Sequence, residues 1–225
     1  MPDPLIIALD LDSAAEARTL IEALGTEIGF YKVGLELYAA AGPDFVRELV
    51  DQGKDVFLDL KFYDIHETVK RATAVAARTG ARFLTVHGVL PVMRAALEGR
   101  GGSSLQLLGV TVLTSFDQQD LSDDYISCDL STLVLHRARH AQALGMDGIV
   151  ASPLEAAALR HALGPEMLIV TPGVRSAGAK RGDQKRVATP AEAMHDGASY
   201  LVIGRQVTRA QDPAAAVRQI RAEIA

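Results

Sequence analysis

Residues 55–87, DVFLDLKFYDIHETVKRATAVAARTGARFLTVH, contain two short apolar runs on either side of a stretch rich in alanine and arginine. The runs Asp55–Lys61 and Phe83–His87 are dominated by the β-branched, leucine and aromatic residues that are typical of buried strands. The stretch Glu67–Thr79 between them has the composition of a helix. A strand, a helix and a second strand in this order form the unit from which parallel sheets are built.

The same alternation extends from this unit to both ends of the chain. Eight strands are predicted in all, each apolar enough to be covered on both faces: Leu5–Asp10, Gly29–Gly34, Asp55–Lys61, Phe83–His87, Leu107–Leu113, Gly148–Ala151, Leu168–Thr171 and Tyr200–Gly204. Predicted helices include Ala14–Leu24, Glu67–Thr79, Leu130–Leu144, Pro153–Ala162, Ala191–Asp196 and Pro213–Ile224. This pattern predicts an α/β fold, a single (β/α)8 TIM barrel in which residues 1–225 form one catalytic domain. An open doubly wound sheet would alternate in the same way, but the number of strands favours the barrel.

The composition of the chain argues against several classes of function. The 225 residues are 48% hydrophobic and carry a net charge of −5 with both signs interspersed, so no basic face for nucleic acid is expected. Cys128 is the single cysteine, and no CxxC or HExxH spacing predicts a zinc site. Asp10 and Asp12 interrupt the N-terminal apolar run too early for a signal peptide or a membrane span. We expect a soluble, cytoplasmic protein without a nucleic-acid or membrane partner.

Polar residues are concentrated where the predicted strands end. They are Asp10, Lys32, Asp59, Lys61, His87, Thr114, Thr171 and Arg205. In a barrel these ends form one rim, where barrel enzymes place their chemistry, so the side chains would converge on one cavity. Taken singly, each has a simpler interpretation as the first solvated group after a strand. Asp10 and Lys32 could form a rim ion pair, and Asp12 with Ser13 could simply cap the first helix.

The segment Asp59-Leu60-Lys61-Phe62-Tyr63-Asp64-Ile65 is the strongest local signal. Asp59 and Lys61 are two residues apart on one strand and therefore face the same side, roughly 7 Å apart along it. A lysine flanked by carboxylates stays protonated, which favours an acid or an electrostatic anchor over a Schiff-base nucleophile. Asp64 has a second interpretation, because Glu67 three residues later fits a variant of the capping box at a helix start.

The last two units carry features of a phosphate site. Thr171-Pro172-Gly173-Val174-Arg175 leads into a loop that contains Gln184, and the last strand ends in Ile203-Gly204-Arg205. Barrels commonly hold a phosphate after strands seven and eight, where glycine allows close approach and arginine supplies a forked donor. A phosphorylated small molecule is therefore the expected ligand.

Together these segments resemble the orotidine 5′-phosphate decarboxylase family. Asp59–Ile65 matches the DxKxxDI signature of that family. Further motifs occur in the family's order along nearly the whole chain: Ala8-Leu9-Asp10, Tyr31-Lys32-Val33-Gly34, Thr85-Val86-His87-Gly88, Val110–Ser115, Thr171–Arg175, Gln184-Lys185-Arg186 and Ile203-Gly204-Arg205. DxKxxD alone is shared with phosphosugar decarboxylases and synthases, whereas its combination with Lys32 and the late phosphate motifs is specific. The chain departs from the family at Tyr63, where His is frequent, and at His66-Glu67, where Pro-Asn is frequent.

The resemblance implies decarboxylation of orotidine 5′-phosphate to uridine 5′-phosphate and CO2, the last step of de novo UMP synthesis, without metal or organic cofactor. Lys61 would stabilise the carbanion that forms at C6 of the pyrimidine and then protonate it. A fixed ammonium suits this task because it meets negative charge as that charge develops. Asp59, Asp64 and Lys32 would complete the catalytic set.

The resemblance also assigns the residues that bind the substrate. Asp10 and Lys32, beside Asp59, would engage the ribose, and Thr114 would line the base pocket. The phosphate would be held by Arg175, Gln184, Arg205 and the backbone of Gly204. Asp64, Ile65 and Thr68 would reach the site of a neighbouring subunit, which implies a homodimer with two shared active sites.

Two other functions stay open at this point. A magnesium-dependent phosphosugar decarboxylase or aldol-type synthase on the same barrel would need a carboxylate for the metal where this chain has Lys32. A phosphosugar-binding or sensor barrel would not turn over a substrate, and the intact set of Asp59, Lys61 and Asp64 argues against it.

Overall fold

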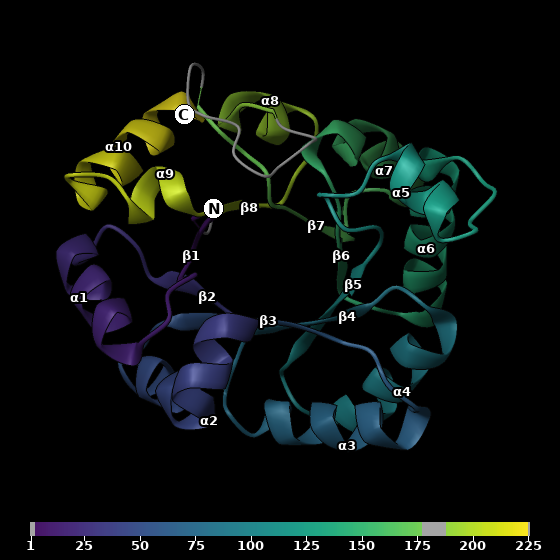
Figure 1. Cartoon of the computed structure of the whole chain (residues 1–225), viewed down its shortest axis with the longest axis horizontal. Coiled ribbons are helices and arrows are strands. Elements are labelled where there is room, and N and C mark those ends of the chain that lie inside the picture. The colour runs from purple at the N-terminus through teal and green to yellow at the C-terminus, as the bar shows by residue number, and fades with distance from the viewer. Residues whose placement is uncertain (1–2, 177–187, 225) are drawn as a thin grey trace.

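The computed structural model describes residues 3–176 and 188–224, and Figure 1 shows a ring of helices around an inner ring of strands. Eight parallel strands succeed one another around a closed barrel in chain order. The last strand pairs with the first, with Leu5 opposite Leu201 and Ile7 opposite Ile203. An open sheet would leave two unpaired edge strands, so the predicted (β/α)8 barrel is confirmed and the doubly wound alternative is wrong.

The strands lie where the sequence predicted them, although several ends differ by up to three residues. They are β1 (Leu5–Ala8), β2 (Phe30–Gly34), β3 (Asp55–Phe62), β4 (Phe83–His87), β5 (Gln106–Val110), β6 (Gly148–Val150), β7 (Leu168–Thr171) and β8 (Tyr200–Ile203). β1 ends at Ala8 and β5 at Val110, two and three residues before the predicted ends at Asp10 and Leu113.

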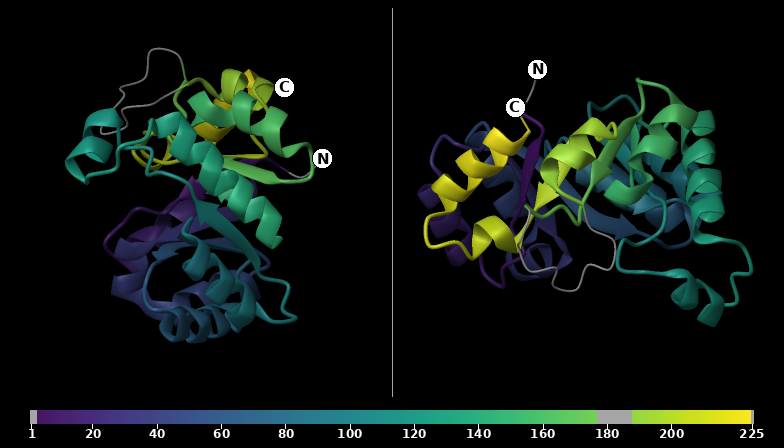
Figure 2. Two further views of the ribbon diagram at one scale, coloured as in Figure 1. Left: turned by 90° about the vertical axis from the view of Figure 1, so that its right-hand side faces the viewer. Right: turned by 90° about the horizontal axis from the view of Figure 1, so that it is seen from above.

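The helices pack around the outside of the barrel, and α5 stands out from it beyond the end of β5 (Figure 2). They are α1 (Ala14–Leu24), α2 (Leu35–Asp51), α3 (His66–Ala77), α4 (Leu90–Arg100), α5 (Gln118–Asp123), α6 (Leu130–Leu144), the 3-10 helix η1 (Pro153–Glu155), α7 (Ala156–Leu163), α8 (Pro190–His195), α9 (Arg205–Thr208) and α10 (Pro213–Glu223). Helices α2, α4, α5 and α9 add to those that the periodicity predicted, and Gly42 and Pro43 interrupt the pattern of α2. Within the described ranges, none of the helices has the length and apolarity that a membrane span needs.

The strands bury apolar side chains on both faces, in one cluster inside the barrel and another between the strands and the helices. Successive side chains of a strand point to opposite faces, so Ile6 belongs to the cluster inside the barrel and Ile7 to the cluster under the helices. The inner cluster consists of Ile6, Ala8, Phe30, Phe57, Phe83, Leu108, Val110, Val150, Val170, Tyr200 and Val202. The outer cluster is larger and is covered by the helices.

Aromatic rings and one arginine fill the end of the barrel where the strands begin. The guanidinium of Arg82 lies 5.2 Å from the ring centroids of Phe30 and Phe83 and 5.5 Å from that of Tyr200. It also donates to the Asp55 carboxylate at 2.7 Å and to the Tyr200 hydroxyl at 2.8 Å. This packing fills the barrel interior where the strands begin, and a larger cavity lies at the opposite end, where the strands finish.

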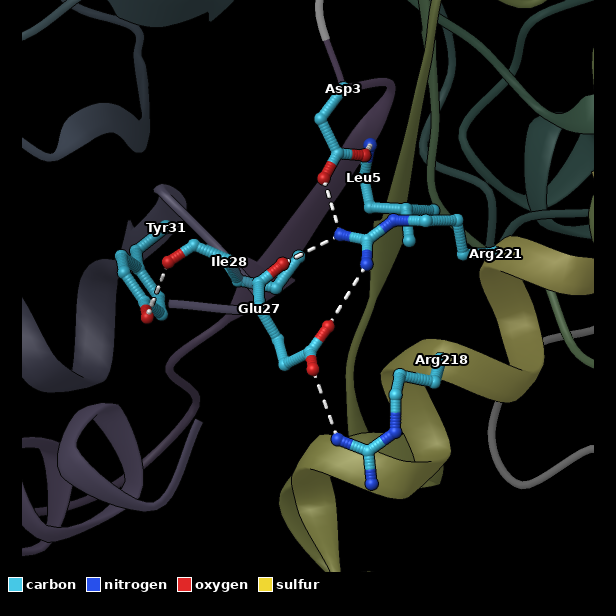
Figure 3. Close-up of polar contacts among 7 residues, drawn as sticks. All are labelled: Asp3, Leu5, Glu27, Ile28, Tyr31, Arg218 and Arg221. Carbon is cyan, nitrogen blue, oxygen red and sulfur yellow. Dashed lines mark hydrogen bonds and ion pairs between the residues drawn. The ribbon is translucent and has the colours of Figure 1, made fainter. Parts of the chain in front are cut away.

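A cluster of ion pairs ties the last helix to the start of the chain (Figure 3). Arg221 on α10 donates to Asp3 at 2.8 Å, to the Glu27 carboxylate at 3.0 Å and to the Glu27 carbonyl at 2.6 Å. Arg218 donates to the other oxygen of the Glu27 carboxylate at 3.0 Å. Asp3 precedes β1 and Glu27 precedes β2, so this cluster fastens α10 across the closure of the barrel.

Candidate active site

The inward-facing positions of the strands change from apolar to charged toward the carboxyl end of the barrel. Phe30 is followed on the same face of β2 by Lys32, and Phe57 is followed on β3 by Asp59. Past the end of β1, Asp10 continues the same alternation, and the amide of the intervening Leu9 still donates to the Lys32 carbonyl at 2.9 Å. The alternation of strand side chains therefore places three charges directly above an apolar core.

These charges line a cavity of about 530 Å³. Its floor contains members of the inner apolar cluster, Ala8, Val110, Val150 and Val202. Eight of the residues that the sequence assigned to the site line it together: Asp10, Lys32, Asp59, Lys61, Thr114, Arg175, Gly204 and Arg205. The volume lies within the range of roughly 300–1,000 Å³ that is usual for small-molecule sites.

Lysines and aspartates alternate across one wall of the cavity. The Lys32 ammonium lies 2.8 Å from an Asp10 oxygen and 3.5 Å from one oxygen of Asp59. The other oxygen of Asp59 accepts from the Lys61 ammonium at 2.8 Å. The Lys61 side chain is 29% exposed and that of Asp59 is 14% exposed, so the ammonium meets the cavity while its counter-ion lies deeper.

The two buried members of this row stay charged. Burial lowers the pKa of the Lys32 ammonium, but Asp59 and Asp10 outweigh burial, and the pKa lies above its ordinary value. Burial raises the pKa of the Asp59 carboxyl, but Lys32 and Lys61 outweigh it, and the pKa lies below its ordinary value. Lys32 and Asp59 therefore hold each other in the charged form.

The backbone of β3 is irregular at Lys61. Between Leu58 and Phe62 the strand advances four residues while its partner β4 advances two, from Leu84 to Val86. Lys61 has a φ of 47°, which is the left-handed region. Its amide donates to the hydroxyl of Thr85 at 3.0 Å, and that hydroxyl donates to Asp59 at 2.9 Å.

Thr85 was missed as a site residue in the sequence, where it stood only within a matching motif. A signal was present: Thr85 comes after Phe83 at the inward-facing spacing that also leads from Phe57 to Asp59. A single threonine in a strand fits ordinary β-propensity, however, and carries no charge to mark it. Glu36 and Arg209, which line the mouth of the cavity, were missed as well.

Two arginines, which follow β7 and β8, lie near each other in the lining of the cavity. Burial lowers the pKa of the half-buried Arg175, and nearby Arg205 lowers it further. The Arg175 amide donates to the Ala188 carbonyl at 3.0 Å, which fixes the chain as it leaves β7. Two like charges beside each other make this wall favourable for an anion. Gln184 lies outside the described residues.

The segment after β3 lies apart from the cavity lining. Asp64, Ile65 and Thr68 are exposed, and Ile65 is 72% exposed. Asp64 accepts from the Ile65 amide at 2.6 Å, and α3 begins after Ile65 without a side-chain capping bond in the described structure. The capping box considered for Asp64 and Glu67 is therefore wrong, because the helix starts one residue too late for Asp64 to cap it. Ser13, in contrast, does cap α1, accepting from the Glu16 amide at 3.3 Å.

Two of the predicted rim residues have local contacts instead. Thr171 is fully buried and donates to the Tyr200 carbonyl at 3.3 Å. His87 packs its ring on Tyr63, with 5.1 Å between centroids. Across residues 3–176 and 188–224, histidine, cysteine, aspartate and glutamate form no group of three or more that could hold a metal ion.

Known proteins of one family match this chain nearly end to end. The family model described as Orotidine 5′-phosphate decarboxylase / HUMPS family matches residues 3–220. A protein named orotidine 5′-phosphate decarboxylase from Nitrobacter winogradskyi is 52% identical over 223 residues, which cover 99% of this chain and 93% of that protein. One of the same name from Rhodopseudomonas palustris is also 52% identical, with 99% and 94% covered.

A solved structure agrees with the sequence relatives. The crystal structure of orotidine 5′-phosphate decarboxylase from Lactobacillus acidophilus superposes with a TM-score of 0.85 and 37% identity, covering 98% of both chains. Fold, sequence identity and coverage all point the same way. The chain therefore belongs to the orotidine 5′-phosphate decarboxylase / HUMPS family and is an enzyme of the carboxy-lyase class.

Proposed function

We propose that the chain decarboxylates orotidine 5′-phosphate to uridine 5′-phosphate and CO2, as the last step of UMP synthesis in the cytoplasm. The observation that carries the proposal is the Lys61 ammonium, held 2.8 Å from Asp59 at the wall of a cavity that also contains two arginines. The substrate carries a carboxylate and a phosphate, so it needs cationic groups at both ends. The relatives named for this reaction share about half of the residues.

In the proposed mechanism the bond between C6 of the pyrimidine and its carboxyl carbon breaks, and the electron pair stays on C6. Lys61 faces that carbon, stabilises the developing charge and transfers one proton from Nζ to C6. Asp59 holds the ammonium in place until the transfer. Such fixed charges are effective because they need no reorganisation during the reaction. Solvent then returns a proton to Lys61, and no metal or organic cofactor takes part.

The remaining residues of the cavity bind the rest of the nucleotide. Asp10 and Lys32 engage the ribose, beside Asp59, and Thr114 lines the base pocket. Arg175, Gln184, Arg205 and the backbone of Gly204 hold the phosphate, for which a guanidinium offers a forked pair of donors. The lysines come from β2 and β3 and the arginines from the ends of β7 and β8, so the reacting carbon and the phosphate would be held by different strands around one cavity.

We further propose a homodimer in which Asp64, Ile65 and Thr68 complete the site of the partner subunit. Asp64 then completes the catalytic set of Lys32, Asp59 and Lys61. Their exposure in the single chain supports this, because a 72% exposed isoleucine beside a 66% exposed tyrosine, Tyr63, is unusual for a solvated surface. The unusual residues His66 and Glu67 are engaged locally, His66 with Glu98 at 3.2 Å and Glu67 with Arg71 at 2.7 Å.

One assay separates the proposal from its rivals. Purified protein is mixed with orotidine 5′-phosphate in excess chelator, and the loss of the orotate absorbance is monitored. We expect full turnover in chelator and no gain on adding magnesium. Activity that disappears with chelator and returns with magnesium would favour the phosphosugar decarboxylase or synthase, and ligand binding without any turnover would favour a sensor.

A further inference from the structure

Thr85 connects the two residues on which the proposed chemistry depends. It is fully buried on β4, and its hydroxyl both accepts and donates a hydrogen bond. It accepts from the backbone amide of Lys61 at 3.0 Å and donates to an oxygen of Asp59 at 2.9 Å. One oxygen atom thus bridges the backbone of the reacting lysine and the carboxylate that holds its ammonium.

The backbone of Lys61 needs such a partner. A lysine with a φ of 47° adopts a conformation that side chains with a Cβ disfavour, so it persists only where neighbouring contacts enforce it. The irregularity of β3 between Leu58 and Phe62 breaks the regular ladder to β4. In place of a backbone carbonyl of β4, the Thr85 hydroxyl accepts the hydrogen bond from the Lys61 amide and so holds the backbone of Lys61 in its left-handed conformation.

The same hydroxyl fixes the direction of the Asp59 carboxylate. One Asp59 oxygen accepts hydrogen bonds from the Thr85 hydroxyl at 2.9 Å and from the Lys61 ammonium at 2.8 Å. The other oxygen faces the Lys32 ammonium at 3.5 Å. We propose that Thr85 is a positioning residue for the decarboxylation: it sets the angle at which Lys61 presents its ammonium to the substrate. This inference rests on the proposed function but adds a residue to it.

Replacing the hydroxyl with a methyl group tests the proposal. In Thr85→Val we expect kcat to fall by about tenfold to a hundredfold, the range for a lost hydrogen bond to a charged group. KM and the affinity for uridine 5′-phosphate stay within about threefold of wild type, because the phosphate contacts are untouched. The acid limb of the pH profile of kcat moves to higher pH, since Asp59 loses a donor that favours its ionised form.

Thr85→Ser and Thr85→Ala form a matched pair that differs by the hydroxyl alone. We expect Thr85→Ser to stay within a few-fold of wild type and Thr85→Ala to behave like Thr85→Val. Thr73→Val is the control for a buried threonine, because the Thr73 hydroxyl has no partner among the described residues and its loss should leave kcat unchanged.

Each of these outcomes supports or overturns the positioning role of Thr85. Wild-type kcat in Thr85→Val, or equal losses in Thr85→Ser and Thr85→Ala, would overturn the positioning role. Failure of both Thr85→Val and Thr85→Ala to fold, seen by circular dichroism, would assign Thr85 a purely structural role and overturn it as well. If the wild-type protein itself does not decarboxylate orotidine 5′-phosphate, the proposed function fails instead, whatever the Thr85 variants do.

Discussion

At the scale of single residues, the site is a row of opposite charges in which each ion is held by its neighbours. The pairing of Asp59 and Lys61 was predictable from sequence, because two charges at strand spacing inside an apolar run are expected on one face. The bond of Thr85 and the left-handed backbone of Lys61 were not predictable, since both arise from the broken ladder between β3 and β4. Local composition carries no signal for such a register shift.

The lowered pKa of Asp59 has a consequence for stability against acid. A carboxyl whose pKa is lower in the folded than in the unfolded chain stabilises the fold above its unfolded value, about 3.9, and this contribution is lost as pH falls through the folded value. In Asp59→Asn this contribution is absent. We therefore expect the free energy of unfolding, measured with urea at pH 5 and at pH 3, to fall less in Asp59→Asn than in wild type. Equal losses in the two proteins would contradict the charge assignment.

At the scale of elements, the sequence located the strands but misread how α3 is capped. All eight strands were located, because doubly covered strands are continuous apolar runs. The predicted start at Glu67 is one residue from the observed start at His66, but the capping box considered for Asp64 and Glu67 was wrong, because the helix takes Ile65 as its cap. The same stretch, exposed in one chain, is the segment for which we propose a role in a partner subunit.

Mixing two inactive variants tests that role. Lys61→Ala and Asp64→Ala should each be nearly inactive as homodimers, because every site then lacks one of the two residues. After mixing and subunit exchange, a heterodimer places both changes in one site and leaves the other intact, so about a quarter of the wild-type activity should return. Size-exclusion chromatography of the wild-type protein should show a dimer. No recovery on mixing, with subunit exchange verified, would place Asp64 in its own chain's site or outside the mechanism.

At the scale of the whole molecule, the barrel depends on joining its first strand to its last. The repeated strand-helix pattern predicted this closure, but no pattern predicted the cluster of Asp3, Glu27, Arg218 and Arg221 that fastens it (Figure 3). Those partners are up to 218 residues apart in sequence, and surface charges at such separations have no local signature. Gln184, a predicted phosphate ligand, lies outside the described residues and stays a prediction.

Loosening this cluster should affect stability but not catalysis. In Arg221→Gln, which loses contacts to Asp3 and Glu27, we expect Tm to fall by about 2–4 °C, the usual response of a domain of this size to a small loss of stability. kcat and KM should be unchanged, because the cluster lies at the end of the barrel away from the cavity. Arg47→Gln removes a pair within α2 alone and should leave Tm within about 1 °C of wild type. Equal shifts in both variants would contradict a role in closure.

The most direct test of the proposed chemistry is the turnover of Lys61→Ala with orotidine 5′-phosphate, measured beside its affinity for uridine 5′-phosphate. If the Lys61 ammonium stabilises and protonates the carbanion, kcat falls by roughly a thousandfold or more while the folded variant still binds the product. Turnover near the wild-type rate in Lys61→Ala would contradict the central claim and remove Lys61 from the mechanism.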